Sequence, residues 1–271
     1  MSRPAVPAAV KRRLRQEAGF GCCRCGFPVV QYQHVIPYSV DPHFRPEDMM
    51  CLCPNCHDMA TKGALPEHEQ RRLKEQPLNI ECGLTAGKLA VTESPLALEL
   101  GSVLVVNDGP IVALDDVVVI AVTYDGASPL LSLDLRGPTG ETVLLIDENE
   151  WVLGHPNVWD ATCDHQKLKL WSAPYKVELQ LDLSRVPGRV RGAFWTGSGK
   201  RIVVTNHGIE FPDTEGRISE LALVRLPVSL TDASITIGGP GGGMMVSEPD
   251  RLERYRKAIN AYRGSRLTGF E

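Results

Sequence analysis

The residues that most directly indicate chemistry in this sequence are two Cys-x-x-Cys pairs, Cys22/Cys25 and Cys53/Cys56. Four thiolates at this spacing are the ligands that a tetrahedral zinc site needs. The segment between the pairs is too short to build a core, so a structural Zn²⁺ would supply the missing stability. Cys23 could replace Cys22, and Cys51 could replace Cys53, although only the first-named pairs have two intervening residues.

Two histidines accompany the cysteine pairs. His34 lies between the pairs in a strand-like segment, and His57 directly follows the second pair. A metal clamp at the base of the loop would hold the two imidazoles in a fixed relation. Because a neutral imidazole can accept a proton near pH 7 or ligate a cation, this arrangement predicts a second, catalytic site.

Short elements are expected to position these groups. They are a helix over 7–18, a strand over 29–36, and helices over 54–62 and 66–75. Gly19 and Gly63 are typical helix stops, and Pro54 suits a first helical turn. The N-terminal part therefore predicts a small zinc domain over 1–80.

From about residue 87 the sequence becomes rich in β-branched residues separated by turns. The expected strands are 97–106, 110–123, 130–135, 142–147, 166–172, 176–182, 189–195, 201–205 and 219–226. Many short strands predict a mainly antiparallel domain over 87–237, sandwich- or barrel-like, and no fixed period selects one architecture. The expected class of the whole chain is α+β.

A Gly-rich hinge begins at residue 238 and precedes a C-terminal amphipathic helix, so 238–271 forms a third segment. Ser247 and Asp250 have the spacing of a capping box for this helix. An apolar stripe follows on one helix face: Leu252, Tyr255, Ile259 and Tyr262. We expect the stripe to dock onto the β domain or onto a second copy in a homo-oligomer.

Composition excludes several classes of protein. An apolar fraction of 43% and a charged fraction of 23% describe an ordinary folded chain rather than a disordered one. No run of 18 apolar residues is present, so no membrane association is expected, and the N-terminus lacks a signal-peptide core. Six of the eight cysteines lie between residues 22 and 56, which indicates metal ligation in a cytoplasmic protein rather than disulfides.

The net charge of −4 is unevenly distributed. Residues 1–75 contain 11 Lys and Arg against 8 Asp and Glu, whereas the remainder contains 18 against 25. A basic N-terminal part is compatible with DNA phosphates as partners. The candidate contacts are Lys11, Arg12, Arg15 and Lys62, with a solvated helix face or a helix-dipole pairing as the alternative.

The remaining histidines and cysteines lack spacing that marks a site. His43 and His68 lie in polar stretches and are expected to be solvated, and His155 is expected in a loop of the β domain, with no partner spacing that marks a site. Cys82 and Cys163 are isolated and expected to be buried or inert.

The N-terminal quarter resembles the HNH endonuclease family. The resemblance rests on Cys22-x-x-Cys25, Gln33-His34-Val35-Ile36-Pro37 and the run from Asp48 to His57. It implies a ββα-metal fold that hydrolyses DNA to 5′-phosphate and 3′-hydroxyl ends. His34 would be the general base, His57 would hold a catalytic divalent cation, and the four cysteines would hold a separate zinc.

Two positions depart from the family pattern. Gln33 stands where many members have aspartate, and its amide would hold Mg²⁺ more weakly, which favours Mn²⁺ or Ni²⁺. Asp48 stands at the family's asparagine, and Asp41 or Asp58 could add a carboxylate. The alternative is a catalytically inactive zinc-ribbon protein that binds nucleic acid. The β-rich domain would serve recognition, oligomerisation or ligand-sensing regulation, as in a bacterial defence effector.

Overall fold

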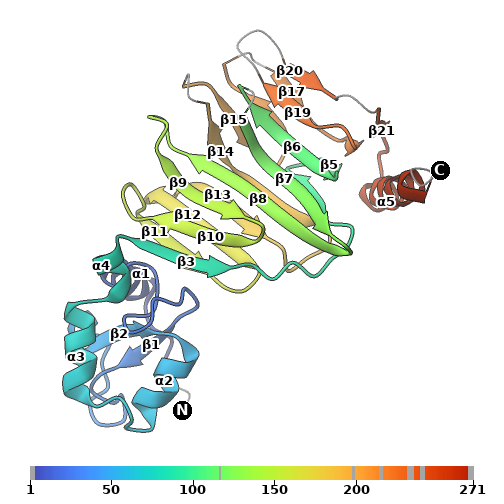
Figure 1. Ribbon diagram of the computed structural model, residues 1–271. Helices are drawn as coiled ribbons and strands as arrows, with labels where there is room; N and C mark the ends of the chain where they lie inside the picture. The colour runs from blue at the N-terminus through green and yellow to red at the C-terminus, as the bar shows by residue number, and fades with distance from the viewer. Residues whose placement is uncertain are drawn as a thin grey trace. The chain divides into compact units, whose positions relative to one another are not determined.

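The computed structural model of this chain describes residues 4–115, 117–196, 199–213, 216–230, 235–238 and 242–267 (Figure 1). It contains two compact units. Unit 1 consists of Met1–Gly87, Val152–His165 and Leu170–Lys176, and unit 2 consists of Lys88–Trp151, Gln166–Lys169 and Val177–Glu271. The predicted α+β class, with many strands, few helices and a C-terminal helix, is confirmed.

Unit 1 begins with short elements joined by tight turns. They are α1 (Ala8–Glu17), β1 (Gln31–His34), the 3₁₀ helix η1 (Pro46–Asp48), β2 (Met49–Leu52), α2 (Pro54–Thr61), α3 (Glu67–Glu75), α4 (Leu78–Cys82) and β3 (Leu84–Lys88). The three helices expected here are confirmed to within one residue at each end. The residue pattern alone does not predict strand β2, because its four residues are all buried and show no alternation.

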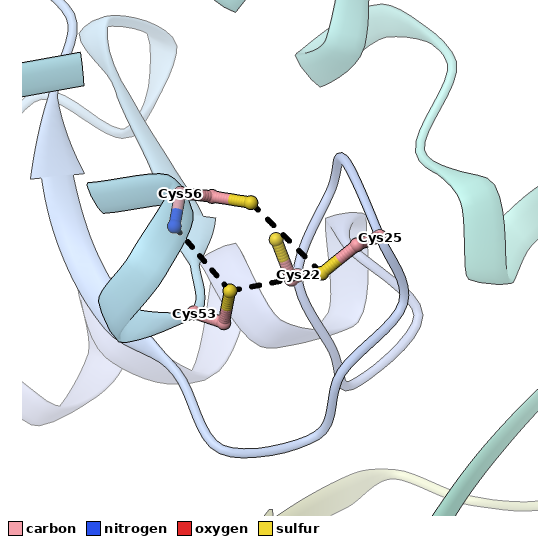
Figure 2. A group of neighbouring side chains, drawn as sticks. All are labelled: Cys22, Cys25, Cys53 and Cys56. Carbon is pink, nitrogen blue, oxygen red and sulfur yellow. Dashed lines mark hydrogen bonds between the residues drawn. The ribbon is translucent and has the colours of Figure 1, made fainter. Parts of the chain in front are cut away.

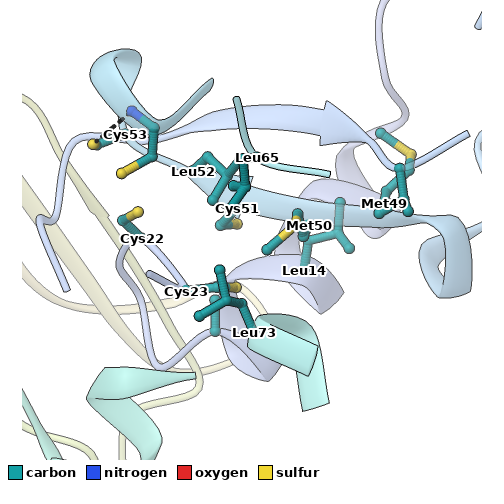
Figure 3. Packing of buried hydrophobic residues seen from close by; sticks show 13 residues of the cluster. Leu14, Cys22, Cys23, Met49, Met50, Cys51, Leu52, Cys53, Leu65 and Leu73 are labelled. Atoms are coloured by element: carbon teal, nitrogen blue, oxygen red, sulfur yellow. Dashed lines mark hydrogen bonds between the residues drawn. The ribbon is translucent and has the colours of Figure 1, made fainter. Parts of the chain in front are cut away.

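Strands β1 and β2 pair antiparallel, and β2 leads directly into α2 (Figure 1). In this register Gln33 lies opposite Met50, and His34 lies opposite Met49. The side chains of β2 pack into a small core with Leu14 of α1 and Leu73 of α3 (Figure 3). Period-two patterning could not predict this strand because the core covers both of its faces.

The segment Val152–His165 also belongs to unit 1, although the sequence places it within the 87–237 region. It approaches α1 through Trp159, whose carbonyl oxygen accepts a hydrogen bond of 2.5 Å from Gln16. Next to it, Arg15 and Asp160 form a bidentate ion pair with N–O distances of 2.9 and 2.5 Å. Side chains distant in the sequence therefore fasten this segment to the first helix.

Unit 2 is built largely from strands, and the chain passes between the units within β3, β10, β12 and β13 and once between β11 and β12. The strands after β3 are β4 (Ala97–Leu100), β5 (Val103–Val106), β6 (Gly109–Leu114), β7 (Val117–Asp125), β8 (Ser128–Arg136), β9 (Thr142–Asp147), β10 (Glu150–Gly154), β11 (Asp160–Cys163), β12 (Lys167–Ala173), β13 (Lys176–Asp182), β14 (Gly188–Trp195), β15 (Arg201–Val204), β16 (Ile209–Phe211), β17 (Gly216–Ile218), β18 (Ala222–Val224), β19 (Val228–Leu230), β20 (Ile235–Ile237) and β21 (Met244–Val246).

Within unit 2, one sheet contains the order β20-β19-β6-β7-β8-β9 and another contains β13-β14-β4-β5-β18-β21. Most pairings are antiparallel, but β4 with β14, β5 with β18 and β6 with β19 are parallel. The expected strand 97–106 is divided into two, because Gly101 turns the chain with a φ of 69°. The parallel pairings bring C-terminal strands beside the first strands of the unit.

The last helix, α5 (Arg251–Leu267), packs onto the sheet of its own chain. Ile259 and Tyr262 are buried against residues of β4, β5, β18 and β21, whereas Leu252 is 57% exposed. The predicted stripe thus docks onto the β domain through its C-terminal part. The predicted Gly-rich hinge includes residues 239–241, which lie outside the described residues. Within the described part of the chain, none of the helices combines the length and hydropathy that a membrane crossing requires.

Candidate functional site: a four-cysteine cluster and a histidine-lined pocket

The four predicted zinc ligands come together in unit 1. Their sulfur atoms all lie within 4.8 Å of one another, and Figure 2 shows them pointing toward a common centre. Cys25 Sγ lies 3.6 Å from Cys53 Sγ and 3.9 Å from Cys56 Sγ. A tetrahedron with Zn–S bonds of about 2.3 Å has edges of about 3.8 Å. The cluster therefore has the donors and the spacing to hold a structural zinc ion.

Local backbone geometry explains why each pair forms a knuckle. In the first, Cys22 O accepts the N–H of Gly26 at 2.9 Å, and Gly26 adopts a positive φ of 76° that permits the tight turn. In the second, Cys53 caps α2 and its Sγ accepts the N–H of Cys56 at 3.5 Å. Pro54 then occupies the first turn of α2. Proline has no backbone N–H, and at this position the helix does not need one.

The thiols of the cluster differ in their tendency to ionise. Burial raises the pKa of both Cys22 and Cys56 to about 11. Burial also opposes ionisation of Cys53, but hydrogen bonds from Cys56 outweigh it and lower the pKa of Cys53. Arg24 Nη1 lies 3.8 Å from Cys56 Sγ at the edge of the cluster. A divalent cation would supply the positive charge that ionising the buried thiols requires.

The structure also resolves which cysteines form the cluster. Cys23 and Cys51 are 2% and 0% exposed and pack in the apolar core, as Figure 3 shows. Burial raises the pKa of Cys23 to about 12, so this residue behaves as a small apolar side chain. Of the isolated cysteines, Cys82 is exposed rather than buried, and Cys163 is partly buried.

A buried hydrogen-bonded group braces the first knuckle from behind. The Nδ2 atom of Asn79 donates to Gly19 O at 3.2 Å, to Gly26 O at 3.0 Å and to Thr85 Oγ1 at 3.1 Å. The ring of His155 lies 2.9 Å from the same Thr85 hydroxyl. Sequence spacing could not indicate this contact, because Thr85 and His155 are 70 residues apart. Burial lowers the pKa of His155.

His34 and His57 line one pocket of about 490 Å³ within unit 1. Gln33, the third residue predicted for the catalytic site, lines the same pocket. The floor and walls also include residues that sequence reasoning did not select: Tyr32, Tyr38, Glu67 and Gln70. The structure therefore brings together one histidine from the end of β1 and one from α2.

His34 is only 5% exposed and is held by its surroundings. Its Nε2 lies 2.9 Å from the carbonyl oxygen of His43, and its ring contacts Tyr38 edge-on with centroids 5.5 Å apart. The expectation that His43 is solvated was wrong, since it is 7% exposed with its ring 5.1 Å from that of His34. His68, by contrast, is exposed as expected.

The amide of Gln33 is oriented by two acceptors. Its Nε2 donates to His34 O at 2.9 Å and to Gln70 Oε1 at 3.4 Å. Gln70 is itself 4% exposed and donates to Leu65 O at 2.8 Å. Because a carboxylate cannot donate to these oxygens, glutamine rather than aspartate is compatible with this network.

The carboxylates near the pocket are mostly engaged with cations. Asp41 pairs with Arg45 at 2.5 Å and Asp58 pairs with Lys62 at 2.8 Å, and both lie outside the pocket lining. Asp48 accepts from Arg45 Nε at 2.9 Å, a hydrogen bond that lowers the pKa of the carboxyl. Across the described residues, the four cysteines form the one cluster of three or more His, Cys, Asp or Glu ligands close enough to hold an ion.

Glu67 is the carboxylate that lines the pocket. It begins α3 directly after Pro66, and its Oε1 lies 2.8 Å from Arg71 Nη2. The sequence signal for it was weak, because an acidic residue in a first helical turn usually serves the helix dipole.

The four predicted phosphate contacts each have a partner within unit 1. Lys62 pairs with Asp58, Lys11 Nζ lies 5.6 Å from the ring centroid of Tyr32, and the Arg12 guanidinium lies 4.3 Å from that of Trp159. Arg15 is 11% exposed in its pair with Asp160, and it also donates to Tyr32. A phosphate contact by Arg15 would require breaking this bidentate pair.

No family model matches the chain, and neither does any curated protein or solved structure.

Proposed function

We propose that unit 1 is a metal-dependent HNH-type endonuclease domain that hydrolyses DNA phosphodiester bonds. The observation that carries this proposal is that His34 and His57 line one pocket in a unit that also has the four-cysteine cluster. The order β1, β2, α2 supports a ββα-metal arrangement, with the first histidine on a strand and the second on the following helix.

His34 would act as the general base. If Nε2 carries the proton and donates to His43 O, the neutral ring keeps its lone pair on Nδ1. That nitrogen would take a proton from the attacking water, and the hydrogen bond at the opposite nitrogen would stabilise the resulting imidazolium. The packing against Tyr38 would hold the ring in a single orientation.

His57 and Gln33 would hold the catalytic divalent cation. The imidazole offers one nitrogen and Gln33 offers a neutral amide oxygen, so the protein would contribute little negative charge to the ion. Such a cation would stabilise charge on the phosphate and the leaving 3′-oxygen. A nitrogen ligand and a neutral amide favour Mn²⁺ or Ni²⁺ over Mg²⁺.

The structural zinc would fix the distance between the two histidines. Cys53 caps α2, and Cys56 and His57 both lie within this helix. Zinc bound to both knuckles would anchor that helix against the loop preceding β1. None of the eight cysteines is in a disulfide, which suits the reducing cytoplasm proposed as its location.

The test is plasmid nicking by the full chain with Mg²⁺, Mn²⁺ or Ni²⁺. Wild-type protein should nick in Mn²⁺ or Ni²⁺ and stop when the ion is chelated. His57→Ala should lose at least about tenfold in rate, as for loss of a metal ligand, while an exposed control, Gln76→Ala, should not. Nicking that survives chelation, or equal rates in both variants, would refute the proposed metal site.

A second candidate is a non-catalytic zinc-ribbon protein that binds nucleic acid. The burial of His34 and its bond to a backbone carbonyl favour this reading, because both would also suit a purely structural histidine. The two candidates differ in one result: the second predicts DNA retention in a gel without strand breaks at any added metal ion.

A further inference from the structure

Unit 2 contains a separate pocket of about 620 Å³ with an unusual charge balance. Five arginines line it, from a loop, from β14 and from α5: Arg185, Arg189, Arg191, Arg251 and Arg254. The carboxylates in the lining are Glu99 of β4 and Asp250, which precedes α5. Cationic side chains therefore outnumber anionic ones by five to two in this pocket.

Glu99 is shared among several of these cations. Its side chain is 7% exposed, and its Oε1 accepts from Arg251 Nε at 2.5 Å. Its Oε2 lies 3.5 Å from Arg189 Nη2 and 3.9 Å from Arg185 Nη2, which are too long for good hydrogen bonds. The Glu99 carboxylate thus faces three guanidinium groups but forms a close ion pair with that of Arg251 alone among these three.

Asp250 does not correct the imbalance. Its Oδ1 accepts the N–H of Glu253 at 2.8 Å, so this carboxylate caps the first turn of α5. The sequence predicted a capping box formed by Ser247 and Asp250, and the structure shows Asp250 itself accepting a backbone N–H of the first turn. Arg254, 7% exposed, donates to the carbonyl oxygens of Glu248 and Ser102 and so holds the helix start in place.

The guanidinium groups on the strand side of the pocket have unused donors. The Nε atoms of Arg185, Arg189 and Arg191 are buried, and none has a hydrogen-bond partner among the described residues. Burial, together with the charges of Arg189 and Arg185, lowers the pKa of Arg191. Buried unpaired donors and neighbouring like charges are both costly, and an anion bound beside these guanidinium groups would offset the repulsion between them.

Apart from Ser102 and Asn206, most of the remaining lining of the pocket is apolar or aromatic. Leu104, Val186, Pro187 and Leu252 line it, and the half-buried ring of Tyr255 lies one helical turn beyond Arg251. A volume of about 620 Å³ falls within the range of small-molecule sites. A cluster of arginines beside an apolar wall suits a ligand with phosphates at one end and a flat ring at the other.

We propose that this pocket binds a phosphorylated small molecule of nucleotide size, with its phosphates held by Arg185, Arg189 and Arg191. The phosphates would pair with the part-exposed guanidinium groups of these arginines, and they would compete with Glu99 for that charge. The proposal concerns unit 2 alone and stands or falls independently of nuclease activity in unit 1.

The first test is isothermal titration of the full chain with ATP and, separately, with pyrophosphate. ATP should bind, and a pyrophosphate affinity equal to or weaker than that of ATP supports the site. Arg189→Ala/Arg191→Ala should weaken ATP binding at least about tenfold, because each charged hydrogen bond contributes substantially. The matched control is Arg256→Ala on α5, a 65%-exposed arginine outside the lining, which should bind as wild type does.

Glu99→Gln keeps every arginine and provides a test that does not depend on removing them. It should bind ATP more tightly than wild type, by a few-fold or more, because the competing carboxylate is gone. Absence of ATP and pyrophosphate binding at millimolar concentration would overturn the proposal. Unchanged affinity in both Glu99→Gln and the double-alanine variant would overturn it too. Absence of ATP binding together with binding of a 12-nucleotide single strand that Arg189→Ala/Arg191→Ala abolishes would instead assign the pocket to nucleic acid.

Discussion

The two units concentrate charge in opposite ways. Unit 1 gathers four sulfurs into a site for a cation, while unit 2 gathers five arginines around one pocket. In unit 1 the predicted phosphate-binding cations each have a local carboxylate or aromatic partner. In unit 2 the buried Nε atoms of Arg185, Arg189 and Arg191 have no hydrogen-bond partner within the described part of the chain. The two units therefore differ in the ion that their side chains could hold: a metal cation at the cysteines of unit 1 and, as we propose, an anion at the arginines of unit 2.

The units also differ in how they reach stability. Unit 1 has a small core in which cysteine and methionine side chains fill much of the space (Figure 3). Small cores of this kind usually need a metal or covalent staple. Unit 2 buries whole strands such as β4 and β5, in which every residue is buried and all but Glu99 are apolar. Loss of a metal ligand or of a buried polar contact should consequently lower the stability of unit 1 far more than a similar loss would in unit 2.

The largest effect should come from removing a zinc ligand. Cys53→Ser should abolish the zinc content and unfold unit 1, since structural zinc sites contribute about 10–16 kcal/mol of binding free energy. Metal analysis and circular dichroism of the purified chain measure both consequences. The control is Cys82→Ser, an exposed cysteine outside the cluster, which should keep one zinc per chain. A folded Cys53→Ser protein with full zinc would remove the contrast between the units.

The next largest effect concerns the ion pair of Arg15 with Asp160. Both side chains are about one-tenth exposed or less, at 11% and 7%. Arg15→Ala should lower the free energy of unfolding by about 3 kcal/mol, because it leaves a buried carboxylate unpaired. Thermal or urea denaturation measures this loss. On the same helix, Arg13→Ala removes a 53%-exposed cation and should cost less than about 1 kcal/mol. Equal losses would show that Arg15 is not a structural cation.

Asn79→Ala tests the brace behind the first zinc knuckle. The variant leaves the carbonyls of Gly19 and Gly26 without a donor they have in the wild type. We expect a loss of about 2 kcal/mol in unfolding free energy, with zinc still bound. Glu81→Ala, an exposed residue on the same helix, is the control and should change stability little. An unchanged free energy of unfolding in Asn79→Ala would mean that Asn79 does not stabilise the first knuckle.

The smallest effect is a pH dependence from His155. Its folded pKa is lowered by burial, so the unfolded state binds the proton more readily. Stability from this residue is therefore complete above the ordinary histidine pKa of about 6.5 and declines as pH falls toward the folded pKa. Melting temperatures measured across pH 5–8 should show this decline. His155→Gln can still donate to Thr85 and should flatten the profile; an unchanged profile would assign the decline to other groups.

Features that depend on neighbouring residues could be predicted from the sequence, whereas features that depend on tertiary contacts could not. The cysteine spacing, the helix limits and the C-terminal helix depend on neighbouring residues, and the structure agrees with each. Strand β2, the burial of His43 and the Asp160 partner of Arg15 depend on tertiary contacts. The arginine pocket joins residue 99 to residues 185–191 and 251–254, so no window of sequence could contain it. The histidine pocket lies between these cases, because its two histidines belong to a local motif.

The most direct test of the account is the rate of plasmid nicking by His34→Ala in Mn²⁺, on preparations matched for zinc content. Removing a general base should lower the rate at least about 100-fold, while the exposed control His68→Ala should nick at the wild-type rate. A zinc-loaded His34→Ala protein that nicks as fast as wild type would contradict the proposed nuclease site.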